Sequence, residues 1–227
     1  MEILAWTREF GPDITAFAGS AAMIGLYYVF LGYRVRRNPT YTIHGVNEVA
    51  RTLWVASVMN NPSRDVMAVQ TLRNFIMGSS LMASTATLLI IGTLTLSGQA
   101  ENISRSWHAL NVVGSHSAEL WIIKVMVLLL DFIVAFFAFA LAVRLLNHIV
   151  FMLNVPDHDA HPALAPQSVA RRLIRAGNLF AVGMRAFFFA VPLVFWLFGP
   201  PFLVVSTVGL VITLYYLDRF QPTEDTR

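Results

Sequence analysis

Five apolar stretches, each close to the length that crosses a lipid bilayer, constrain the fold of this chain more than any other feature. They cover residues 14–33, 75–96, 120–143, 179–198 and 202–217. A membrane-crossing helix needs about 20 predominantly apolar residues. The shorter fifth stretch ends at Tyr215 and Tyr216, which suit the aromatic belt of a membrane interface.

The amount of charge agrees with these stretches. Only 13% of the 227 residues are charged, against about 25% in a soluble domain. The sequence therefore predicts an all-α polytopic helix bundle in a lipid bilayer, folded as a single domain over residues 1–227.

The arginines and lysines are distributed unequally between the loops. Most of the 16 basic residues lie after the first and third stretches and in the tail, at Arg34, Arg36, Arg37, Arg51, Arg64, Arg73, Arg144, Arg171, Arg172, Arg175, Arg219 and Arg227. The opposite side holds Arg8 and Arg105. Cytoplasmic loops of membrane proteins are enriched in basic residues, so the asymmetry predicts an N-terminus outside and a C-terminus in the cytoplasm. It also accounts for the net charge of +3 without a nucleic-acid partner.

Two features extend the fold beyond the five spans. Residues 45–59, GVNEVARTLWVASVM, carry apolar side chains near one side at helical spacing and polar ones opposite. This pattern predicts a cytoplasmic, interfacial amphipathic helix. The second spanning helix is expected to begin near Arg64, after a break at Asn60-Asn61-Pro62. The third is expected to continue past the bilayer to Leu153.

The cytoplasmic stretch also carries a recognisable motif. It consists of N-x-x-x-R-x-x-W-V at Asn47, Arg51, Trp54 and Val55, followed by Q-T-L-R-N with Gln70, Arg73 and Asn74. With these residues the chain resembles the family of bacterial and plant membrane proteins called domain of unknown function 599. The resemblance implies a shared architecture and an importance of the motif residues, and it implies no chemistry. We expect a multi-pass protein of a bacterial cytoplasmic (inner) membrane.

The motif residues are too polar and too regularly spaced to be topology signals alone. Asn47 and Arg51 share a helix face, as do Gln70 and Asn74. One interpretation is a polar clasp between the amphipathic helix and the second spanning helix. The others are a site for an anionic lipid headgroup at the cytoplasmic face, or a basic vestibule that attracts anions.

Asp131 stands near the middle of the third apolar stretch. At about 1.5 Å per residue it is about 15 Å deep, where an ionised side chain facing lipid would cost about 3 kcal/mol or more. Small residues at compatible helical spacing, Ala135 and Ala138, predict that it points into the protein. Three interpretations follow: an ion pair with Arg185 of the fourth stretch, a point on an ion or proton pathway, or a protonated carboxyl bonded to a neighbouring helix.

Two other sets of polar side chains lie within the spans. Lys124 is near the outer end of the third stretch, where it is expected to reach the interface or to pair with Glu119. The second stretch carries hydroxyls in its cytoplasmic half, at Ser79, Ser80, Ser84, Thr85 and Thr87. They indicate either tight helix packing or the wall of a pore, and make this helix the first candidate for the axis of a homo-oligomer.

Cofactor chemistry finds little support. The chain has no cysteine, which excludes disulfides and thiolate metal sites. No two of its histidines lie at matched depth in facing spans, as a haem would need. The His158–His161 pair has metal-like spacing but lies in a proline-rich loop, so no metal and no cofactor is predicted.

These features lead to two functional hypotheses. The first is an oligomeric channel or small transporter for small ions, with a preference for anions because of the basic inner mouth and Arg185. The alternative is a non-enzymatic structural or accessory subunit of a larger membrane complex, or a lipid-binding scaffold. An enzyme is disfavoured because no nucleophile and base lie together at one membrane interface.

Overall fold

The computed structural model describes residues 2–98, 118–155 and 161–219, and these residues are almost entirely helical. The described residues form six α-helices, which are α1 (Glu2–Arg37), α2 (Ile43–Met59), α3 (Asp65–Gly98), α5 (Ala118–Leu153), α6 (Pro166–Trp196) and α7 (Pro200–Asp218). Short 3-10 helices, Pro39–Tyr41 and Pro62–Arg64, precede α2 and α3. All but α2 are long and apolar enough to cross a membrane. The predicted membrane bundle of five spanning helices and one further helix is confirmed.

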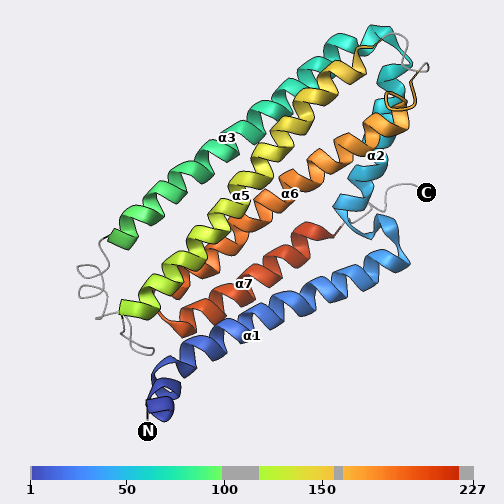
Figure 1. Ribbon diagram of the computed structural model, residues 1–227. Helices are drawn as coiled ribbons and strands as arrows, with labels where there is room; N and C mark the ends of the chain where they lie inside the picture. The colour runs from blue at the N-terminus through green and yellow to red at the C-terminus, as the bar shows by residue number, and fades with distance from the viewer. Residues whose placement is uncertain (1, 99–117, 156–160, 220–227) are drawn as a thin grey trace.

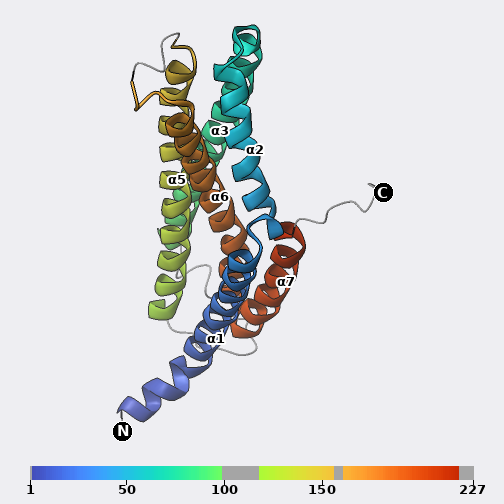
Figure 2. The same ribbon diagram turned by 90° about the vertical axis from the view of Figure 1, so that its right-hand side faces the viewer.

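The spanning helices pack in the order α3, α5, α6, α7, α1. α5 contacts both α3 and α6, α7 packs on α6, and α1 packs on α7. Figure 1 shows α3, α5 and α6 running side by side, with α7 and α1 beyond them. α2 lies along α6, as Figure 2 also shows, at the end of the bundle remote from the N-terminus.

Four of the five spanning helices are much longer than a bilayer requires. α1, α3, α5 and α6 have 36, 34, 36 and 31 residues, which correspond to about 45–55 Å at 1.5 Å per residue. A hydrocarbon core is about 30 Å thick. The extended second and third spans were predicted. α6 is longer than predicted, because it begins at Pro166 rather than near residue 179.

The early start of α6 has a clear physical reason. Val169, Leu173 and Ala176 are buried at helical spacing, whereas Arg171 and Arg172 are exposed between them. This segment is amphipathic rather than uniformly apolar, so it does not form part of a continuous apolar stretch in the sequence.

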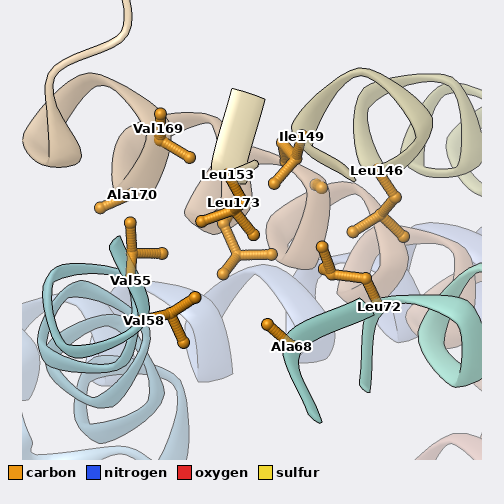
Figure 3. Close-up of a cluster of buried hydrophobic side chains, with 11 residues drawn as sticks. Val55, Val58, Ala68, Leu72, Leu146, Ile149, Leu153, Val169, Ala170 and Leu173 are labelled. Atoms are coloured by element: carbon orange, nitrogen blue, oxygen red, sulfur yellow. The ribbon is translucent and has the colours of Figure 1, made fainter. Parts of the chain in front are cut away.

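The extended ends of the helices form a core of their own with α2. Val55 and Val58 of α2 meet Leu72 of α3, Ile149 of α5 and Leu173 of α6 in one buried cluster. Figure 3 shows these side chains converging from four helices. Each buried valine or leucine contributes about 1.5–3 kcal/mol. The side of α2 that carries these valines is therefore packed against the other helices of the protein.

The turn between α6 and α7 is tight, as the Gly199-Pro200-Pro201 sequence predicts. Gly199 has φ 139°, a backbone conformation that residues other than glycine rarely adopt. Pro200 then occupies the first turn of α7, where its missing N–H costs nothing.

Candidate functional site

A buried charge pair joins three helices at the end of the bundle remote from α2. Lys124 Nζ lies 2.7 Å from Asp13 Oδ1, and the Trp196 indole N–H donates to the same oxygen at 2.9 Å. Asp13 and Lys124 are 0% and 3% exposed. We call these three residues the Asp13 clasp. The predicted pairing of Lys124 with Glu119, or its snorkelling to the interface, is wrong, because the charged partner comes from α1.

A second charge pair lies near the α2 end of the bundle. Arg185 Nη2 lies 3.2 Å from Asp218 Oδ1, and the Tyr27 hydroxyl donates to Asp218 Oδ2 at 2.7 Å. The Arg185 guanidinium also lies over the Tyr28 ring, 5.2 Å from its centroid. The predicted Asp131–Arg185 ion pair is therefore wrong, because Arg185 extends towards α7 and α1 instead of α5.

Asp131 itself is half-buried on α5. Its Oδ2 is enclosed and has no hydrogen-bond partner among residues 2–98, 118–155 and 161–219. It therefore lies partly inside the protein, as predicted, but the described part of the chain supplies neither a counter-charge nor a donor to that oxygen.

Arg51 is the motif residue with the most unusual surroundings. Its guanidinium lies against the backbone of α6 at Gly177, where any Cβ would overlap it. Its Nη1 is buried and has no hydrogen-bond partner in the described ranges. Burial lowers the pKa of Arg51 from its ordinary value, and the nearby Glu48 carboxylate opposes that shift. Arginine stays protonated regardless, so the half-buried Arg51 carries a charge and one enclosed donor that is unused within the described residues.

Two neighbouring cavities open beside these arginines. One, of about 540 Å³, lies between α1, α2 and α6, and the other, of about 370 Å³, lies between α2, α3, α6 and α7. His44, Ala181 and Arg185 line both cavities. Arg51 lines the smaller one, together with Asp218. We call the two cavities with Arg51 and Arg185 the arginine site.

Further polar groups surround the arginine site. Asn178 lines the larger cavity, and its buried Oδ1 has no partner within the described residues. His44 Nε2 lies 3.4 Å from Glu48 Oε1, and both side chains are exposed. Asn47 lines the smaller cavity. The site thus combines two guanidinium groups, the carboxylates of Glu48 and Asp218, and an amide with apolar walls.

The remaining motif residues do not join this site. Gln70, Arg73 and Asn74 are exposed on α3, and Trp54 is half-buried against the cluster of Figure 3. The predicted polar clasp between α2 and α3 is not formed as expected, because Arg51 contacts α6. The motif thus divides into a part that lines the arginine site and a part on the surface.

The hydroxyls of α3 are largely used within their own helix. Ser79, Thr85 and Thr87 donate to the carbonyl oxygens four residues earlier, at 2.8, 2.9 and 3.1 Å. Ser79 is fully buried, Ser80 is half-buried, and Ser84, Thr85 and Thr87 are exposed. Such bonds satisfy a hydroxyl in an apolar setting without a neighbouring helix.

Sequence reasoning overlooked four residues of these sites. Asp13 and Asp218 lie just outside the predicted apolar stretches, and Gly177 and Asn178 lie just before the fourth one, so none of the four was considered. One signal was available: Gly177 lies inside a helical pattern, where a glycine costs about 1 kcal/mol relative to alanine and so invites a search for a close contact.

No group of three or more metal-ligating side chains occurs among the described residues. The HDAH sequence at residues 158–161, where no metal was predicted, lies mostly within residues 156–160, outside the described part of the chain.

Comparison with known proteins gave one match. The family model described as "Protein of unknown function, DUF599" matches residues 15–223. No curated protein and no solved structure matches the chain.

Proposed function

The chain belongs to the DUF599 family, and from that premise we propose that it is a membrane protein that binds an anionic group at the arginine site. The observation that carries this proposal is the buried Arg51 Nη1, which has no partner in the described ranges and lies at the wall of a cavity. An enclosed donor without a hydrogen-bond partner is costly. An oxyanion in the cavity supplies the missing acceptor.

The composition of the site supports an oxyanion such as a carboxylate or phosphate. Guanidinium groups present paired N–H donors that match the oxygens of these anions. Arg51 and Arg185 line the same cavity of about 370 Å³, so both guanidinium groups border one space in which an anion can bind. Binding is favoured over catalysis, since the site offers no nucleophile with an adjacent base.

The location of the site supports access from the cytoplasm. The α2 end of the bundle carries most arginines, including Arg34, Arg144 and Arg172. By the positive-inside rule this end faces the cytoplasm, with the N-terminus outside, in a bacterial cytoplasmic membrane. The surrounding basic side chains raise the local concentration of anions.

The test is stabilisation by inorganic phosphate in detergent at constant ionic strength. A ligand that binds only the folded state stabilises it by about 2.7 kcal/mol at 100 times its dissociation constant. We expect phosphate to raise the unfolding temperature of the wild type but not of Arg51→Gln. The exposed Arg73 of α3 gives the matched control Arg73→Gln, which keeps the response. An equal response of all three proteins would contradict the proposal.

A second candidate is an oligomeric channel or small transporter for small ions, with a preference for anions. Two observations favour it: the enclosed Asp131 oxygen without a partner in the described ranges, and the exposed hydroxyls of Ser84, Thr85 and Thr87 on α3. In a homo-oligomer, α3 can contribute these hydroxyls to a shared wall.

Flux in proteoliposomes separates this candidate from an accessory subunit. We expect ion-dependent flux from the wild type and a reduced flux from Asp131→Asn and Arg185→Ala. A clean monomer by light scattering together with no flux under several gradients contradicts the channel. Stoichiometric co-purification with other membrane proteins supports the accessory alternative.

A further inference from the structure

A shallow apolar groove continues from the arginine site along the surface between α6 and α7. It encloses about 430 Å³. Its walls are Phe188, Val191 and Phe195 of α6 and Phe202, Val205, Ser206, Gly209, Leu210 and Thr213 of α7. Phe188 also lines the smaller cavity of the arginine site. The groove and that cavity are thus consecutive along one face of the helix pair.

The helical spacing of the lining residues supports this continuity. On α7, Leu210 lines the groove and Leu214, one turn later, lines the cavity. On α6, Met184 lines the cavity and Val191, two turns later, lines the groove. From Phe202 to Leu217 the α7 wall rises about 22 Å at 1.5 Å per residue, which is most of a hydrocarbon core about 30 Å thick.

The groove offers no free polar group that would select a polar ligand. The Ser206 hydroxyl donates to the Phe202 carbonyl at 2.6 Å, and the Thr213 hydroxyl donates to the Gly209 carbonyl at 2.9 Å. Gly209 has open space beside it, because a Cβ there would meet nothing within 4 Å. The wall is therefore effectively apolar and is indented at Gly209.

A charged head and an apolar groove on one face match an anionic amphiphile. Resting on the function proposed above, we propose that the ligand is an anionic phospholipid, with its phosphate at Arg51 and Arg185 and an acyl chain in the α6–α7 groove. The phosphate accepts a hydrogen bond from the enclosed Arg51 Nη1, while Asp218 neutralises part of the charge of Arg185. A soluble anion occupies the head position alone and leaves the groove empty.

Native mass spectrometry of the full chain tests the proposal. The probes are phosphatidylglycerol and phosphatidylcholine vesicles, and inorganic phosphate is tested separately. We expect the wild type to retain phosphatidylglycerol at least about tenfold more strongly than phosphatidylcholine, a ratio that corresponds to about 1.4 kcal/mol. Equal retention of both lipids overturns the proposal.

A groove-filling variant separates the acyl chain from the head. Gly209→Phe places a ring in the open indentation, and we expect it to weaken phosphatidylglycerol retention about tenfold while stabilisation by inorganic phosphate persists. Gly92→Phe is the matched control, since Gly92 of α3 also has open space beside it and lies away from the groove. Gly209→Leu replaces Gly209→Phe if the larger side chain prevents folding.

The outcomes distinguish the two proposals. If Gly209→Phe retains phosphatidylglycerol as strongly as the wild type does, no acyl chain uses the groove and the lipid inference fails. Stabilisation by phosphate without selective lipid retention also overturns the lipid inference and leaves the anion site standing. If the wild type shows neither stabilisation by phosphate nor selective retention of phosphatidylglycerol, both proposals are overturned.

Discussion

The two charge clusters of this protein are built from similar residues but differ in how completely their charges are used. In the Asp13 clasp, carboxylate, ammonium and indole are enclosed and bonded to one another. At the arginine site, Arg185 is about one-third exposed beside Asp218, and the half-buried Arg51 has an enclosed Nη1 with no hydrogen-bond partner among the described residues. The first cluster is closed, and the second is open towards two cavities.

This difference suggests separate roles for the two clusters, with the Asp13 clasp serving stability and the arginine site serving the proposed binding. A buried pair with complete bonds contributes to a unique arrangement of helices and leaves nothing for a ligand. An incomplete set of donors beside a cavity costs stability in the empty protein, and a ligand recovers that cost. Substitutions in the Asp13 clasp should therefore affect folding, whereas substitutions at the arginine site should affect ligand affinity.

The largest expected effect follows from Lys124→Met. This change leaves Asp13 buried without its counter-charge, and we expect the free energy of unfolding to fall by about 3–5 kcal/mol. Thermal unfolding in detergent measures it. The double variant Asp13→Asn with Lys124→Met removes both charges and should recover most of the loss. If the double variant is as unstable as the single one, the pair is not the source of the stability.

An intermediate effect is expected from two glycines of α6 with opposite surroundings. At Gly183 a Cβ would meet the buried Phe139 ring at 2.7 Å, so Gly183→Ala should cost about 1–3 kcal/mol by overpacking. At Gly177 the obstacle is the mobile end of Arg51. Gly177→Ala should therefore leave stability nearly unchanged and reduce stabilisation by phosphate. Unfolding curves with and without phosphate compare the two, and a reversed pattern contradicts the distinction.

The smallest effect on stability is expected from Asp218→Asn. The Arg185–Asp218 pair is partly exposed, so its loss should cost about 1 kcal/mol or less. On the proposed function, Asp218 competes with the anion for Arg185, so the variant should bind anions more tightly than the wild type. A phosphate titration followed by thermal unfolding measures the change. Weaker binding in the variant would show that Asp218 orients Arg185 instead of competing.

The architecture was predictable because hydrophobicity adds up over long windows. Five spans and the amphipathic helix α2 follow from runs of 15 to 20 residues in which single exceptions matter little. The N-terminal part of α6 was not predicted as part of that span, because Arg171 and Arg172 interrupt the run while Val169 and Leu173 are buried.

The pairing of charges was much less predictable. Asp131 and Arg185 lie in spans close in sequence, and a similar depth made them natural partners. Which partner a long side chain selects depends on its rotation about the helix and on neighbours from distant segments. Arg185 extends to Asp218 and Lys124 to Asp13, and neither acid stands out within its own span. The motif was enough to single out Arg51 as a candidate site residue. The cavity beside Arg51 could be identified only in the structure.

The length of α7 has a consequence for the position of the arginine site in the membrane. α7 has 19 residues, about 28 Å, and has no spare turns, whereas α3, α5 and α6 extend well beyond a bilayer. A thicker bilayer therefore has to thin locally, or α7 has to stand more upright, for Asp218 to stay at the surface. Through Asp218, Arg185 follows that adjustment. On the proposed function, the chain length of the surrounding lipids should therefore set how deep the arginine site lies, and with it how readily an anion reaches the site.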